Sequence, residues 1–255
     1  MTRKFSEIGQ HMKEIENSIQ IRAYAMMRQL SLSVKTFEKN YELFKQHLES
    51  INNMDYWFEL SDSRRSPMKW EYHASDQETY RQLLNFVASA QALVEHTRSL
   101  VEELYLETDF QKEYQDKVNK ELKDHPTRKF VQELRNYVLH SKFPFVGAQF
   151  SHNRLSSIGD QENLFATSVK LTLNKEELLE SDRWTAPSKL FLASQDELIF
   201  LDVLADEYYS LINDFQMWLN KRQKEMHESE YTSLLENWKN LYQELQKAIE
   251  MQQFD

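Results

Sequence analysis

The chain has 255 residues, of which 3 are Gly, 4 are Pro and none is Cys, and its formal net charge at neutral pH is −10. The absence of Cys excludes disulfides, a cysteine nucleophile and thiolate metal sites. The few glycines form no glycine-rich nucleotide-binding loop, which argues against nucleotide-dependent enzymes of those classes. Because an acidic chain repels nucleic acid, any contact with RNA requires a local basic surface.

The N-terminal segment has no apolar run of signal-peptide length, and no stretch of about 18 apolar residues occurs anywhere in the chain. We therefore expect a cytoplasmic protein that makes no membrane contact.

Two amphipathic helices are predicted at the start of the chain, over residues 3–30 and 32–51, because their apolar residues recur at steps of three and four. Whether Ser31 and Ser33 separate the two helices is left open by the pattern. Asn52 and the Asn after it favour a helix end.

A loop is predicted over residues 59–75, where Ser, Asp, Arg and Pro67 are mixed. A long helix follows over 76–105, and Thr108 is positioned to cap the next one, which runs to about Leu122. Pro126 marks the first turn of a further helix, since proline is tolerated at that position. The apolar residues of this helix lie on one face and are Phe130, Val131, Leu134, Tyr137 and Val138.

The period then changes to the alternation of a strand. Two strands are predicted, over Phe145–Phe150 and Leu164–Leu173, as an antiparallel hairpin that occupies about 145–173. Pro144 and Gly147 are expected to end the helix that begins at Pro126. Asn174 is expected to cap a short helix, and residues 195–250 are expected to be helical. The expected fold is mainly α: a single helical domain over 1–255 with an inserted hairpin and a C-terminal helical extension over 187–250.

The helix that begins at Pro126 carries three polar residues, Arg135, Asn136 and His140, away from its apolar face. Asn136 and His140 are four residues apart and therefore share one surface of the helix. A guanidinium binds phosphate oxygens, and an imidazole transfers protons near neutral pH. Such a group of side chains suits phosphodiester chemistry and needs no metal ion or other cofactor.

The segment Arg135-Asn136-Tyr137-Val138-Leu139-His140 resembles the Arg-x(4–6)-His motif of the HEPN superfamily, in which a polar residue commonly follows the Arg. HEPN domains are helical bundles that usually dimerise, and their catalytic members are metal-independent endoribonucleases of toxin–antitoxin, abortive-infection and CRISPR systems. The resemblance implies that Arg135 contacts the scissile phosphate, that His140 is the general acid or base, and that Asn136 orients the site. It also implies an RNA substrate, a homodimer and a role in phage defence or beside a cognate antitoxin.

Local charge supports contact with RNA. Residues 125–154 contain five Lys or Arg and one acidic residue, Glu133, which gives this window a net charge of +4. Besides Arg135, the candidate RNA-binding residues are Arg128, Lys129, Lys142 and Arg154. These charges equally suit pairing with acidic helices elsewhere in the chain.

A second Arg-x4-His pair, Arg222 and His227, lies in a highly charged helical stretch and is interpreted as solvated surface. Two alternatives to the ribonuclease remain. One is a non-catalytic HEPN-like interaction protein that binds a partner protein, since HEPN architecture does not by itself establish catalysis. The other is a coiled-coil scaffold, which suits the long helices but not the hairpin.

Overall fold

The computed structural model describes residues 2–52, 57, 74–154 and 165–252. The chain is mainly helical and carries a small antiparallel sheet, which confirms the expected fold class. The elements in chain order are α1 (Thr2–Glu16), α2 (Ile19–Ser50), α4 (Ala74–Leu104), α5 (Asp109–Lys117), the π-helical turn η1 (Val118–Leu122), α6 (Pro126–His140), β1 (Val146–Arg154), β2 (Phe165–Asn174), α7 (Lys175–Leu179), α8 (Ala186–Ser194), β3 (Leu198–Phe200) and α9 (Leu201–Gln252).

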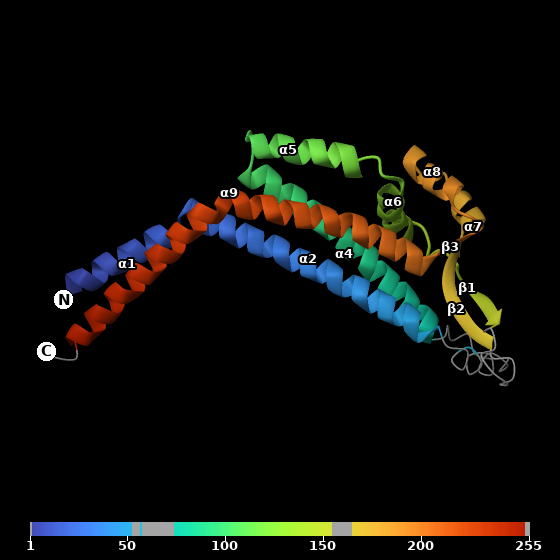
Figure 1. The fold of residues 1–255 in the computed structure, drawn as a ribbon, viewed down its shortest axis with the longest axis horizontal. Helices are drawn as coiled ribbons and strands as arrows, with labels where there is room; N and C mark the ends of the chain where they lie inside the picture. The colour runs from blue at the N-terminus through green and yellow to red at the C-terminus, as the bar shows by residue number, and fades with distance from the viewer. Residues whose placement is uncertain (1, 53–56, 58–73, 155–164, 253–255) are drawn as a thin grey trace.

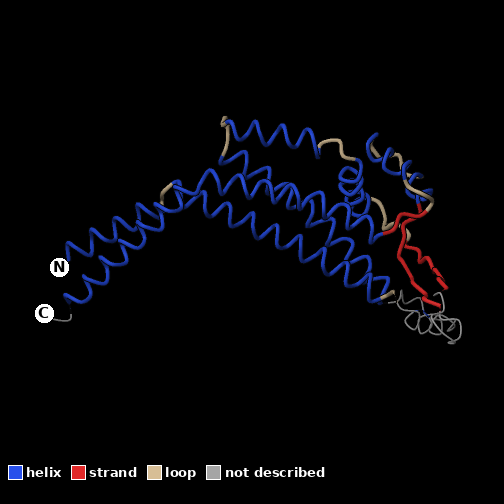
Figure 2. The backbone as a smooth tube through the Cα atoms, viewed as in Figure 1, coloured by secondary structure: helices blue, strands red, loops and turns tan. Residues whose placement is uncertain are grey.

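Three long helices form the body of the molecule, because α2, α4 and the first half of α9 run alongside one another (Figure 1). The second half of α9 pairs with α1 in an arm that bends away from this body and ends near both termini (Figure 2). The sheet and α6, α7 and α8 lie at the opposite end. The arm has its own small apolar core, whose buried residues are Ile8, Ile15, Leu241 and Ala248.

The break between the first two helices lies at Asn17–Ser18, and α2 continues without interruption through Ser31 and Ser33. Ser18 is the N-cap of α2, and its hydroxyl accepts a hydrogen bond from the amide of Ile21 at 3.3 Å. Such a cap satisfies one of the amide groups left free at a helix start. The serines at 31 and 33 lie in mid-helix, where the hydroxyl of Ser33 donates to the carbonyl of Gln29 instead.

Several predicted helix starts are confirmed. Thr108 accepts from the amide of Gln111, Asn174 accepts from the amide of Glu177, and α6 begins at Pro126. Helix α4 begins at Ala74, two residues before the expected start, and α6 ends at His140 rather than at Pro144. The predicted loop over 59–75 lies almost entirely outside the described residues.

The predicted hairpin is present as β1 and β2, which pair antiparallel with Val146 opposite Leu173. The expectation that helix covers all of 195–250 is wrong at its start, because Leu198–Phe200 form β3, which pairs antiparallel with β2. Ile199 is 1 % exposed in this strand. Its burial against the sheet outweighs the helical periodicity of the residues that follow it.

The core of the body contains a cluster of aromatic rings from α2, α4 and α9. Phe37 and Phe86 lie 5.8 Å apart between ring centroids, and Phe44 and Phe86 lie 5.6 Å apart. Tyr208 contacts both Phe37 and Phe86 edge-on. These contacts explain why three long helices stay together along the body, since each aromatic side chain buries a large apolar area. Among the described residues, no helix is both long and apolar enough to cross a membrane.

His47 gives the stability of this body a dependence on pH. Burial lowers the pKa of His47 from its usual value, and its Nε2 lies 2.7 Å from the hydroxyl oxygen of Thr79. The imidazole of His47 therefore binds a proton more readily in the unfolded chain than in the folded chain. The folded state has its full stability above the pKa that His47 has in the unfolded chain, and it loses stability as pH falls from that value through the lower pKa of the folded state. Between slightly basic and mildly acidic pH, the wild type should lose more free energy of unfolding than His47→Gln in urea titrations. Equal losses in the two proteins would contradict this expectation.

Candidate functional site

Helix α6 is held in place by the aromatic residues of its buried face. Phe130 is 0 % exposed and stacks against Phe191 of α8 and against Trp184, at centroid distances of 4.4 and 5.4 Å. Tyr137, two turns further along α6, also stacks against Trp184, at 5.6 Å. These four rings hold α6 against α8 and the segment that joins α7 to α8.

A hollow of about 220 Å³ lies between α6 and this segment. Its lining residues are Glu133, Asn136, Tyr137, His140, Arg183 and Trp184. Tyr137 and Trp184 are buried and form its apolar wall, whereas Asn136, His140 and Arg183 are exposed at its rim. We refer to this feature as the α6 hollow.

His140 is the last residue of α6, and its side chain is exposed. Its backbone carbonyl accepts a hydrogen bond from Nη1 of Arg183 at 3.1 Å. Among the described residues, no group lies within hydrogen-bond or ion-pair distance of the imidazole. The ring is therefore accessible for proton transfer with a bound molecule.

Asn136 and Arg135 are joined by a hydrogen bond, in which Nη1 of Arg135 donates to Oδ1 of Asn136 at 3.0 Å. Asn136 lines the α6 hollow with His140, as their spacing on the helix predicts. Arg135 does not line it, because a residue five positions before His140 faces a different side of the helix. Its side chain is half-buried, and its Nε is buried without an acceptor in the described part of the chain.

The arginine that lines the hollow is Arg183, not Arg135 of the motif. The loop that carries it is held by Glu133, whose two carboxylate oxygens accept from the amide and the hydroxyl of Thr185 at 2.8 and 2.5 Å. The indole of Trp184 donates to the carbonyl of Leu178 at 2.5 Å. Sequence reasoning missed Arg183, since it lies 43 residues after His140 in a segment with no motif.

Of the other predicted RNA-binding residues, those whose side chains the structure describes do not form one compact strip. Arg128 lies near the opposite end of α6, about 18 Å along the helix from His140 at 1.5 Å per residue, and its guanidinium is 3.5 Å from the carbonyl of Lys123. Lys129 follows it and is half-buried. Lys142 forms an ion pair with Glu177 at 3.0 Å, and this contact raises the pKa of Lys142. Arg154 belongs to β1, but its side chain lies outside the described part of the structure.

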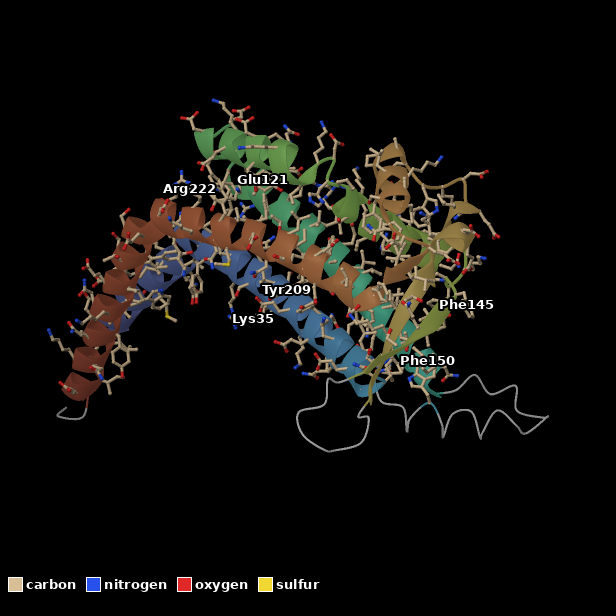
Figure 3. All side chains as sticks on the ribbon, turned by 45° about the vertical axis from the view of Figure 1, so that its right-hand side comes forward. Lys35, Glu121, Phe145, Phe150, Tyr209 and Arg222 are labelled. Atoms are coloured by element: carbon tan, nitrogen blue, oxygen red, sulfur yellow. The ribbon has the colours of Figure 1, made fainter. Side chains whose placement is uncertain are left out.

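Both residues of the second Arg-x4-His pair contact other side chains and not solvent alone: the side chain of Arg222 is 33 % exposed and that of His227 is 14 % exposed. Arg222 of α9, which is labelled in Figure 3, donates from Nε and Nη2 to the two carboxylate oxygens of Glu113 on α5, each at 2.8 Å. His227 contacts the hydroxyl of Tyr105 at 2.9 Å and the carboxylate of Glu230 at 2.7 Å. Hydrogen bonding to Arg222 also lowers the pKa of Glu113.

This ion pair should contribute to stability by a small, measurable amount. Arg222→Ala is expected to lower the free energy of unfolding only slightly, because the pair is bidentate but one third exposed. Urea titrations of Arg222→Ala, Glu113→Ala and the double variant measure the coupling between the two side chains. Lys221→Ala, which removes an exposed neighbouring charge, is the matched control. Strict additivity of the two substitutions would contradict the assignment.

Within the described residues, no three His, Asp or Glu side chains lie together in a way that could hold a metal ion. Comparisons of the chain with protein-family models, with curated proteins and with solved structures find no match.

Proposed function

We propose that the chain is a metal-independent endoribonuclease of HEPN type that cleaves RNA at the α6 hollow. The observation that carries this proposal is the exposed imidazole of His140, which has no partner in the described structure and shares one hollow with Asn136 and the guanidinium of Arg183. The resemblance of residues 135–140 to the Arg-x(4–6)-His motif supports the same function.

In the proposed reaction His140 accepts the proton of a ribose 2′-hydroxyl. The 2′-oxygen then bonds to the adjacent phosphorus, the bond from phosphorus to the 5′-oxygen breaks, and the departing 5′-oxygen takes a proton from water. The hydroxide left behind removes the proton from His140 and restores the neutral imidazole. The products are a 2′,3′-cyclic phosphate and a 5′-hydroxyl. Asn136 lies at the rim with His140, and its side chain is held by a hydrogen bond from Arg135. Asn136 and Arg135 therefore orient the RNA strand.

The test is cleavage of end-labelled RNA by the wild-type protein in EDTA. Cleavage that persists in EDTA and leaves 2′,3′-cyclic phosphate ends supports the proposal. The matched control is the same RNA with 2′-deoxy substitution, which removes the nucleophile and should remain intact. Cleavage of the deoxy substrate, or the absence of cleavage across several unrelated RNAs, would contradict the proposal. A role in phage defence or beside an antitoxin rests on the resemblance alone, and the cleavage assay does not test it.

A second candidate function, a partner-binding helical protein, is favoured by one feature of the arm. Leu235, Tyr242 and Ile249 recur at seven-residue steps on α9 and are 70, 62 and 44 % exposed. They lie beside the buried stripe that packs on α1, so the apolar surface of the arm is wider than a two-helix pair covers. A second copy of the chain would complete a four-helix bundle there. Light scattering of the wild type and of Leu235→Ser/Tyr242→Ser tests this, and a wild-type monomer would contradict it.

A further inference from the structure

Two arginines are close to the α6 hollow, but their side chains are used differently. Arg135 donates to the side chain of Asn136, does not line the hollow, and has a buried Nε. Arg183 lines the hollow and is exposed, and among the described residues its guanidinium donates one hydrogen bond, to the backbone carbonyl of His140. A guanidinium has five N–H donors in a planar fork, so Arg183 keeps donors that can bind a ligand.

Arg183 forms no ion pair with a carboxylate in the described part of the chain. Glu133 is the acidic residue that lines the hollow, and its two oxygens accept hydrogen bonds from Thr185 rather than from Arg183. Its negative charge remains beside the hollow, so Arg183 is the group that has to offset it when an anion binds. The wall formed by Tyr137 and Trp184 is buried and apolar, so it offers no charge that competes with Arg183 for an anion.

The position of the hollow makes this cation necessary for anion binding. The hollow lies at the C-terminal end of α6, where free carbonyl groups carry partial negative charge and repel anions. Arg183 donates to one of these carbonyl groups, that of His140, and so places a full positive charge where the helix alone would be unfavourable.

We propose that Arg183 and His140 together bind a phosphate group in the α6 hollow, and that Arg183 is the guanidinium that contacts the reacting phosphodiester, a role that rests on the proposed ribonuclease function. Arg135 is then a positioning residue that acts through Asn136. The phosphate-binding arginine then lies outside the Arg-x4-His segment, in the segment between α7 and α8.

Phosphate binding is tested first, without RNA, by NMR of the His140 imidazole protons in the full chain, assigned with His140→Gln. At a fixed neutral pH, inorganic phosphate should shift this resonance saturably in the wild type. The shift should be lost in Arg183→Gln, partly restored in Arg183→Lys, and retained in Arg135→Gln. Lys189→Gln, which removes another exposed charge from the same region, is the control and should behave as the wild type. Loss of the shift in Arg135→Gln, or its retention in Arg183→Gln, would overturn the assignment, as would a wild type that shows no shift.

Cleavage assays on the same variants separate this inference from the proposed function. Arg183→Gln should reduce RNA cleavage by roughly 10²–10³-fold, mainly in kcat, as expected for loss of a donor to developing charge. A phosphate shift that depends on Arg183 in a protein that cleaves no RNA would retain the binding site and reject the ribonuclease. Cleavage that depends on His140 but not on Arg183 would retain the ribonuclease and reject the role of Arg183.

Discussion

His140→Ala is expected to slow RNA cleavage by roughly 10²–10⁴-fold, the usual effect of removing a general acid or base. The same substitution should change the free energy of unfolding by less than about 0.5 kcal/mol, because the side chain is exposed and forms no hydrogen bond or ion pair with a described group. The hydrogen bond from Arg183 goes to the backbone carbonyl of His140, so it can persist in the variant. The substitution therefore removes the imidazole and leaves the rest of the hollow in place.

The measurement is the single-turnover cleavage rate of wild type and variant in EDTA, with folding monitored by circular dichroism. His11→Ala is the matched control, because His11 is also an exposed histidine but lies on α1 in the arm. It should cleave RNA at the wild-type rate. Cleavage that survives in a folded His140→Ala protein would place the active site elsewhere.

Phe130→Ala is expected to lower the free energy of unfolding by about 3–5 kcal/mol, the typical cost of removing a fully buried aromatic ring. Phe130 is 0 % exposed and stacks against both Phe191 and Trp184. Its loss leaves a cavity between α6 and the segment that carries Arg183. The effect should therefore extend to the α6 hollow and reduce phosphate binding as well as stability.

Urea unfolding followed by circular dichroism and tryptophan fluorescence measures this effect. Leu190→Ala is the matched control on α8, because Leu190 is 65 % exposed and its truncation should change the free energy of unfolding by less than about 0.5 kcal/mol. A loss below about 1 kcal/mol in Phe130→Ala would mean that the contact between α6 and α8 contributes little.

Local patterns in the sequence predict much of the fold. The apolar spacing after Pro126 predicts α6, Thr108 and Asn174 predict their helix starts, and the alternation of apolar residues predicts the β1–β2 hairpin. Each of these signals acts over a few residues, through a cap, a turn or one face of an element. The placement of Asn136 and His140 on one surface has the same origin.

Other features depend on competition between neighbouring signals and are decided by packing. The apolar period of the first helices continues across Asn17 and Ser18, so it does not show that α1 ends there rather than at Ser31. The strand β3 is three residues long and depends on its pairing with β2, which no local pattern reveals.

For the candidate site, the sequence by itself determined the helix that carries Asn136 and His140 and the chemical character of those side chains. Only the tertiary structure decided which arginine shares their hollow. Arg183 is 43 residues from His140, and it arrives there because the rings of Phe130, Tyr137, Phe191 and Trp184 pack α6 against the segment between α7 and α8. The partners of Arg222 were decided in the same way, since Glu113 lies 109 residues away on another helix. Helical periodicity places residues on a face, but contacts across such separations arise only when the buried faces of different elements pack together.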